Sequence, residues 1–220
     1  HAGTIAYDPG LDTLPDAQGW TRFEGGPTQP GPSVTSGVLH QGPTDVSGYQ
    51  YWQSTAASFD FTTSAVVVDF RMQVIESSYN AYPRGGYTVF LSDAGGRFAA
   101  LYLTSGSVFL GNDVNNSVSA IMPFDTTDGY HDYQLTIDAT GSALAIDGNP
   151  IVSLGLGGST SSEHLIVFGD GTVLGNSETN LTRFSVSGVT ITAVPEPASL
   201  TVLGVSLGGL AALRRRRAPG

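Results

Sequence analysis

Cysteine and lysine are both missing from this 220-residue sequence, and only 13% of its residues are charged. Without cysteine no disulfide can stabilise the fold, so stability must come from a hydrophobic core, which a chain of this length can bury. Four of the nine arginines lie together at positions 214–217, close to the end of the sequence. Residues 1–193 carry the other five arginines and 18 acidic side chains, which gives them a net charge of −13. Such a domain is a poor partner for nucleic acid or anionic lipid, which need cationic neutralisation, and a reasonable one for divalent cations.

Helical periodicity is also missing before residue 194. The clearest pattern is in residues 65–74, where apolar side chains alternate with polar ones, as expected for a half-buried antiparallel strand. Further strands are predicted between turn residues at 3–7, 20–24, 34–41, 49–53, 87–91, 98–103, 107–110, 118–122, 131–137, 143–147, 151–154, 164–168 and 181–192. We therefore expect an all-β domain over residues 1–193, an antiparallel two-sheet sandwich of about a dozen strands.

The last predicted strand changes phase along its length. Phe184 and Val186 share one face, whereas Val189 and Ile191 are out of phase with them. One extra residue at positions 187–188 would restore inward pointing, so a β-bulge is predicted there.

The C-terminal residues 194–220 have a different composition. Prolines 195 and 197 favour a linker over residues 194–197, and the uncharged run 198–213 would span about 24 Å as a helix, slightly less than a bilayer core. The arginines that follow predict a cytoplasmic tail, 214–220, with the preceding domain exported. The alternative, a buried core helix with a basic tail, would have no partner to pack on.

This tripartite tail resembles the PEP-CTERM sorting signal. The matching residues are Pro195, Glu196, Pro197, Arg214, Arg215, Arg216 and Arg217. The resemblance implies a bacterial protein held briefly in the inner membrane, recognised by an exosortase-type membrane protease and released towards the cell surface or its polysaccharide matrix. Export needs a signal peptide, which we expect to have preceded His1.

Several short segments resemble the concanavalin A-like, laminin G-like jelly-roll superfamily. They are 14–20 (Leu-Pro-Asp-Ala-Gln-Gly-Trp), 129–133 (Gly-Tyr-His-Asp-Tyr), 135–138 (Leu-Thr-Ile-Asp), 144–148 (Leu-Ala-Ile-Asp-Gly) and 168–172 (Phe-Gly-Asp-Gly-Thr). The resemblance implies two packed sheets. Members of the superfamily often bind glycans, sometimes with calcium, and some are glycosidases, but the fold alone carries none of these functions.

Glycan binding would need exposed aromatic faces beside polar groups. Tyr49, Tyr51 and Trp52 lie in one stretch. Tyr79, Tyr82 and Arg84 fall in a predicted loop and form a candidate rim, since binding residues concentrate on loops. The alternative is that the tyrosines fill the core, as we expect of Trp20 and Trp52.

Calcium would need six to eight oxygen ligands. Asp113 and Asn115 in one polar loop, and Asp170 in a predicted turn, could supply some of them. The same residues also occur in plain turns, because their side chains bond locally to the backbone.

Catalysis is not expected. Glycoside hydrolysis needs two carboxylates flanking the substrate, and the four glutamates of the domain (24, 76, 163 and 178) are not spaced along one strand as that would require. The sequence therefore favours a non-catalytic surface protein, carbohydrate-binding or adhesive. A glycosidase with an unrecognised site and a purely structural matrix component are the alternatives.

Overall fold

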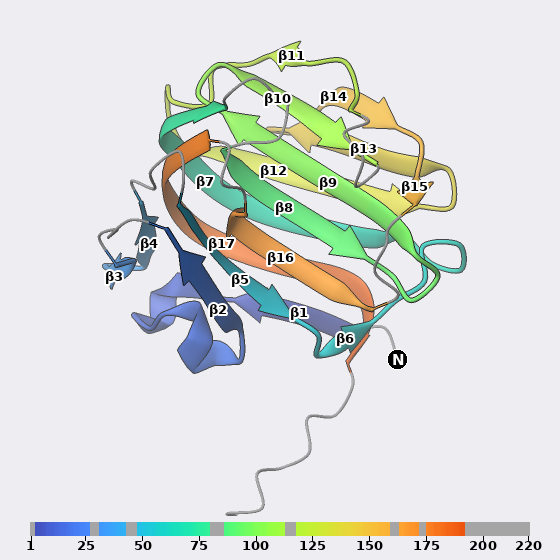
Figure 1. Ribbon diagram of the computed structural model, residues 1–220, viewed down its shortest axis with the longest axis horizontal. Coiled ribbons are helices and arrows are strands. Elements are labelled where there is room, and N and C mark those ends of the chain that lie inside the picture. The colour runs from blue at the N-terminus through green and yellow to red at the C-terminus, as the bar shows by residue number, and fades with distance from the viewer. Residues whose placement is uncertain are drawn as a thin grey trace, which may run out of the picture.

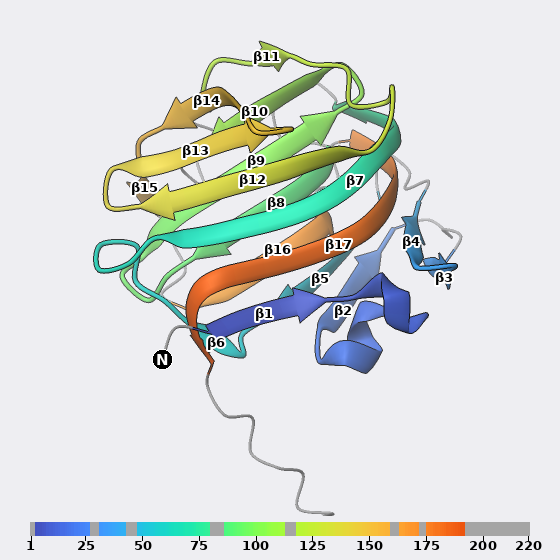
Figure 2. The same ribbon diagram turned by 180° about the vertical axis from the view of Figure 1, so that it is seen from behind.

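The computed structural model describes residues 3–26, 31–42, 48–79, 86–112, 118–158, 163–171 and 175–191. These residues form two antiparallel β-sheets packed face to face (Figures 1 and 2). Figure 1 looks onto the sheet that we call sheet B, and Figure 2 looks from behind onto sheet A. The predicted two-sheet sandwich is confirmed.

Sheet A is built around two long neighbouring strands, β7 and β17. Its order is β14-β13-β12-β7-β17-β4-β3, and both β1 and β6 also pair with β17. The bounds are β1 (Gly3–Tyr7), β3 (Ser33–Thr35), β4 (Val38–Gln41), β6 (Ala57–Ser58), β7 (Val66–Tyr79), β12 (His131–Asp138), β13 (Gly141–Ile146), β14 (Asn149–Leu154) and β17 (Gly175–Ile191).

Sheet B has the order β11-β10-β9-β8-β16-β5-β2, with β15 pairing onto β9. Its strands are β2 (Thr21–Gly25), β5 (Tyr49–Ser54), β8 (Tyr87–Ser92), β9 (Arg97–Thr104), β10 (Ser107–Gly111), β11 (Met122–Pro123), β15 (Gly157–Gly158) and β16 (Leu165–Asp170). Two short 3-10 helices, η1 (Pro9–Leu11) and η2 (Pro15–Gln18), connect β1 to β2.

The core lies between the sheets, and aromatic rings occupy its centre. Phe168 of β16 stacks on Phe184 of β17 with ring centroids 4.4 Å apart, which joins the two sheets. Trp20 meets the edge of Phe168 at 4.9 Å and is 3% exposed, and Trp52 is fully buried. The prediction that both tryptophans fill the core is confirmed.

The predicted alternation and bulge are also present. Val66, Val68, Phe70, Met72 and Val74 are all fully buried, as period-two patterning of a half-buried strand requires.

The bulge in β17 lies at Gly188, which is skipped when Thr4 pairs with Ser187 and Gly3 with Val189. Val189 returns to the core at 1% exposure, as predicted, but Ile191 is 45% exposed at the end of the strand.

Two of the predicted strands differ in the structure. Residues 34–41 form a hairpin of two strands, because Ser36 and Gly37 both take positive φ (54° and 76°) and turn the chain between β3 and β4. Residues 118–122 form no continuous strand: Val118 makes an isolated bridge to Gly111, and pairing resumes only in β11.

In the described ranges no helix is both long and apolar enough to cross a membrane. The predicted membrane segment, 198–213, lies outside those ranges.

Candidate functional site

The outer face of sheet B carries a row of residues that crosses six strands. Cross-strand pairing places them side by side, and we call them the outer aromatic row: Phe23, Tyr51, Gly169, Thr88, Tyr102 and Phe109. Five of them each lie one residue from a core residue, and Phe23 pairs directly with Tyr51, so all six positions lie on the opposite face from the core. The row has an aromatic pair at each end, and only glycine and threonine between them.

The first pair, Phe23 and Tyr51, is stacked with centroids 5.2 Å apart and an interplanar angle of 11°. Tyr49 lies 5.8 Å from Tyr51, and all three rings are partly exposed. Tyr49 pairs with Gly25, and a Cβ at Gly25 would lie within 2.8 Å of the Tyr49 ring, so this ring lies across the glycine. Burial, with Tyr49 as a second cause, raises the pKa of Tyr51, so its phenol stays neutral. This end offers an open aromatic surface.

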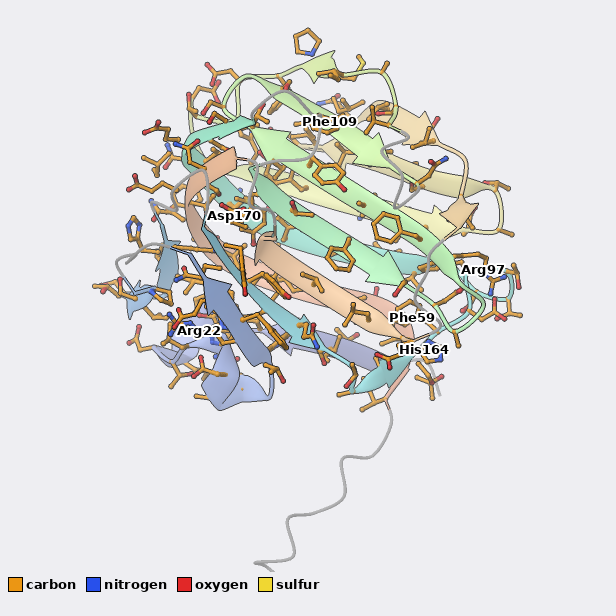
Figure 3. All side chains as sticks on the ribbon, viewed as in Figure 1. Arg22, Phe59, Arg97, Phe109, His164 and Asp170 are labelled. Atoms are coloured by element: carbon orange, nitrogen blue, oxygen red, sulfur yellow. The ribbon has the colours of Figure 1, made fainter. Side chains whose placement is uncertain are left out.

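The second pair, Tyr102 and Phe109, is stacked at 5.1 Å and 17° but is only 4% and 0% exposed. It belongs to a separate apolar cluster with Phe98 and Ala100, against which Phe90 packs. Figure 3, which looks onto sheet B, shows Phe109 on β10 at the far side of the sheet from Arg22 of β2. This half of the row is part of a closed cluster, so the accessible half is the one on β2 and β5.

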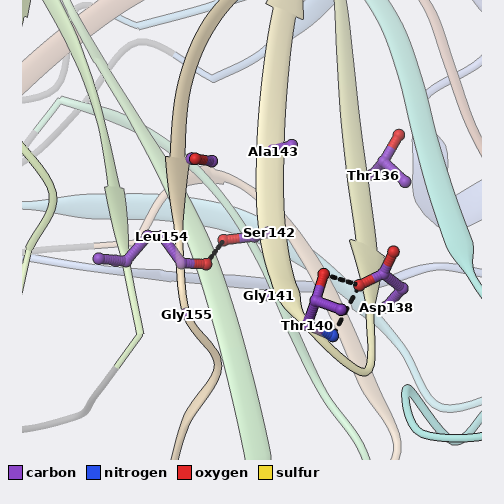
Figure 4. Close-up of a pocket in the computed structure, with 9 residues that line it drawn as sticks. Thr136, Asp138, Thr140, Gly141, Ser142, Ala143, Leu154 and Gly155 are labelled. Atoms are coloured by element: carbon purple, nitrogen blue, oxygen red, sulfur yellow. Dashed lines mark hydrogen bonds between the residues drawn. The ribbon is translucent and has the colours of Figure 1, made fainter.

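A polar hollow of about 350 Å³ lies at the hairpin end of β12 and β13 (Figure 4). Hydroxyl groups dominate its lining, and Asp138 is its one carboxylate. Asp138 accepts hydrogen bonds from the Thr140 backbone N–H at 2.7 Å and from the Thr140 hydroxyl at 2.6 Å, and these bonds lower its pKa. A single, already bonded carboxylate does not provide an acid–base pair for hydrolysis.

A second hollow, of about 290 Å³, lies between β6, β17 and His164. His164 Nδ1 accepts the Phe59 backbone N–H at 3.2 Å, which leaves the ring proton on Nε2. Asp60 borders the same hollow, but its carboxylate is bonded to Thr62 and to Arg97, and the Thr62 hydrogen bonds are the main reason that its pKa is lowered. Figure 3 shows Phe59, His164 and Arg97 at the same end of the sandwich.

His131 is held between two carboxylates on sheet A. Its Nδ1 lies 2.7 Å from Asp147 and its Nε2 lies 2.7 Å from Asp128. Burial lowers the pKa of His131, but the two hydrogen-bonded carboxylates outweigh it, so the pKa is raised. We call these three residues the His131 clamp, because they connect the turn at Asp147 to the loop at Asp128. No group of three or more His, Asp or Glu side chains placed to hold a metal occurs in the parts of the chain that the structure describes.

Most site residues predicted from the sequence lie outside the described residues. These are Tyr82, Arg84, Asp113, Asn115 and the sorting residues Pro195, Glu196, Pro197 and Arg214 to Arg217. Tyr79 is the last residue of β7. Asp170 was expected in a turn, but β16 continues to include it, and its side chain is fully buried.

Two features were missed by the sequence reasoning. Phe23 is stacked on Tyr51 although it was read only as part of a short strand, because the pairing of β2 with β5 joins segments that are not hairpin neighbours. Glu76 of β7 and Glu178 of β17 lie directly opposite each other on sheet A. Glu76 accepts a 3.2 Å hydrogen bond from Asn176, and Glu178 lies 3.6 Å from His40 Nε2. This glutamate pair lies outside both hollows.

Comparison with known proteins identifies the fold. A scan against protein-family models finds none that matches the chain, and a search of curated proteins finds no match either. Among solved structures, the chain is similar to a carbohydrate esterase from Shiga toxin-encoding bacteriophage phi24B, with 13% identity, a TM-score of 0.59, and 88% of this chain and 100% of that chain covered.

Two further structures have similar scores. A Bacillus subtilis protein with a galectin-like fold has 12% identity and a TM-score of 0.55, with 88% of this chain and 100% of that chain covered. The exoplasmic/lumenal domain of VIP36, in a Ca²⁺/Man2-bound form, has 10% identity and a TM-score of 0.55, with 89% and 92% covered. The described residues therefore form a jelly-roll-like sandwich, similar to the galectin-like fold of the Bacillus subtilis protein.

Proposed function

We propose that this chain is an exported, non-catalytic carbohydrate-binding protein whose binding surface is the accessible half of the outer aromatic row, around Phe23, Tyr49 and Tyr51. The observation that carries the proposal is the group of three partly exposed rings on β2 and β5, one of them lying across a glycine. A sugar ring presents a face of C–H groups that packs on such a ring, while its hydroxyls need polar partners. Exposed Thr21 and half-buried Gln53 lie on the same face and could provide them.

The similar structures support carbohydrate as the ligand class. One is described as a carbohydrate esterase and another as a Ca²⁺/Man2-bound domain. At 13% and 10% identity these descriptions make carbohydrate a reasonable ligand class for the fold, without deciding between binding and catalysis.

The test is binding of residues 1–193 to a polysaccharide panel, with calcium and then with a chelator. Tyr51→Ala should weaken binding at least about tenfold, the equivalent of about 1.4 kcal/mol of lost ring contact. Tyr130→Ala is the matched control, because Tyr130 lies beside Arg71 on sheet A. Unchanged binding by Tyr51→Ala, or an equal loss in Tyr130→Ala, would contradict the proposed surface.

A glycosidase is the second candidate, and the opposed pair Glu76 and Glu178 is the observation that favours it. Two carboxylates on adjacent strands can approach the separation of about 5 Å that retaining glycosidases use. The pair lies outside both hollows, however, and each glutamate has a neighbour of its own. Release of reducing sugar from the same panel, abolished by Glu178→Gln, would establish this alternative.

Export is proposed on the sequence of the tail. Residues 194–220 would act as a PEP-CTERM signal that holds the protein in the inner membrane until an exosortase-type protease releases it to the cell surface or extracellular matrix. Replacing Pro195, Glu196 and Pro197 with alanine should leave the protein in the membrane fraction. Normal release of that variant would argue against this sorting route.

A further inference from the structure

Four polar side chains occupy core-facing positions at one end of the sandwich, and we call them the interior oxygen cluster. They are Gln41 of β4, Gln50 of β5, Asp170 of β16 and Thr179 of β17, which are 1%, 1%, 0% and 0% exposed. Gln41 pairs with Thr179 in sheet A, and Gln50 pairs with Asp170 in sheet B. Figure 3 shows Asp170 at the end of β16.

A hydrogen bond brings the two pairs together across the sandwich. The side-chain amide of Gln41 donates through Nε2 to the backbone carbonyl of Gln50. Because a carbonyl oxygen only accepts, this bond fixes the orientation of the Gln41 amide and turns its Oε1 away from Gln50 O. Gly169 packs tightly here, since a Cβ at that position would lie 2.7 Å from Gln50 O and 3.1 Å from Gln41 Nε2.

Three side-chain oxygens of the cluster lack hydrogen-bond partners among the described residues: Gln41 Oε1, Gln50 Oε1 and Thr179 Oγ1. Buried polar atoms are normally paired, so a group of orphans calls for a specific explanation. All three atoms are oxygens, and they belong to side chains that are cross-strand neighbours of one another or of the Asp170 carboxylate. Carboxylate, amide and hydroxyl oxygens are the hard ligands that calcium takes in proteins.

We propose that the interior oxygen cluster is a calcium site. Asp170 supplies the negative charge, Gln41 and Gln50 supply amide oxygens, and Thr179 supplies its hydroxyl oxygen. Calcium suits this set better than magnesium, which usually keeps several of its waters and binds through only one or two carboxylates. The site is independent of the aromatic surface on β2 and β5, so it goes beyond the proposed carbohydrate binding. Its ion would link β4 and β17 of sheet A to β5 and β16 of sheet B.

The test uses the full 220-residue chain in detergent, stripped with a chelator and titrated with calcium chloride by calorimetry. Terbium is a second probe, because Trp52 lies two residues from Gln50 on the same face of β5 and can sensitise its luminescence. Asp170→Asn should weaken calcium binding at least about tenfold, since it removes the one charged ligand. Gln50→Glu should strengthen it, because it adds a second carboxylate.

Two controls separate this site from other effects. Asp93→Asn changes an equally buried aspartate whose carboxylate is bonded to Arg97 and Phe61, so it should leave calcium affinity unchanged. Asp113→Asn tests the polar loop that the sequence offered as a candidate for calcium. The proposal is overturned if the stripped protein binds no calcium, if Asp170→Asn binds as tightly as the wild type, or if Gln50→Glu gains nothing. A crystal structure grown with calcium that shows only water between Gln41 and Gln50 would also overturn it.

Discussion

Replacing Asp93 with alanine tests whether one buried carboxylate organises the turn between β8 and β9. Asp93 is fully buried, and its carboxylate accepts three hydrogen bonds: from Arg97 Nε at 2.7 Å, from the Arg97 backbone N–H at 3.0 Å and from the Phe61 backbone N–H at 3.2 Å. The alanine variant leaves two backbone donors without this acceptor, at about 1–3 kcal/mol each, and breaks an ion pair. Arg97 keeps its bond to Asp60 at 2.8 Å, which limits the loss.

We therefore expect Asp93→Ala to lower the free energy of unfolding by about 3–5 kcal/mol. For a domain of this size that corresponds to a fall in Tm of about 10 °C. Urea denaturation of residues 1–193 measures the change directly. Asp60→Ala is the control: it touches the same arginine through an exposed carboxylate and should have a small effect. An equal loss in both variants, or no loss in Asp93→Ala, would refute the reasoning.

Two further predictions concern the clamp and the bulge. Because its pKa is raised, His131 stabilises the fold in its charged form, so stability should fall as pH rises through that pKa, and His131→Asn should flatten this part of a melting profile taken against pH. Asp147, whose pKa is lowered mainly by its bond to His131, should lose its contribution as pH falls below 3.8; a profile with the opposite slopes would contradict the assignment. Gly188→Ala should cost about 1–3 kcal/mol in urea denaturation, because Gly188 has a φ of 79° and its Cβ would lie 2.2 Å from the Ala65 carbonyl. Gly148→Ala is the control, because Gly148 has a φ of 78° but open space around its Cβ, so this variant has only the backbone strain. Equal losses of stability in the two alanine variants would exclude a contribution from the clash at Gly188.

The sequence predicted the sandwich because its long strands follow the rule that apolar side chains face inward. Five alternating residues of β7, from Val66 to Val74, are all fully buried, and the phase change in β17 correctly located the bulge. These features depend only on local alternation, which is visible in one segment at a time.

The candidate sites could not be found in the same way, because β5 follows that rule only at Trp52. Its buried positions are Gln50, Trp52 and Ser54, while Tyr49 and Tyr51 lie on the outer face. The buried polar residues and the outward tyrosines of β5 are explained by their contacts with β2, β4 and β16. The register of these contacts is set by tertiary packing, which one segment of sequence does not show. Asp170 shows the same limit, since a buried aspartate after a glycine has the sequence pattern of a turn.

The length of β17 has a mechanical consequence. The strand runs antiparallel to β7 over most of its length and also pairs with β1, β4 and β6. A pull on Ile191 along the strand axis, with the rest of sheet A held, loads these ladders in shear, so many hydrogen bonds must break together. A pull that separates Gly3 from Ile191 instead peels β1 from β17 one pair at a time, because Gly3 pairs with Val189 at that same end. The domain should therefore resist tension applied through β17 and sheet A far better than tension applied between its two ends.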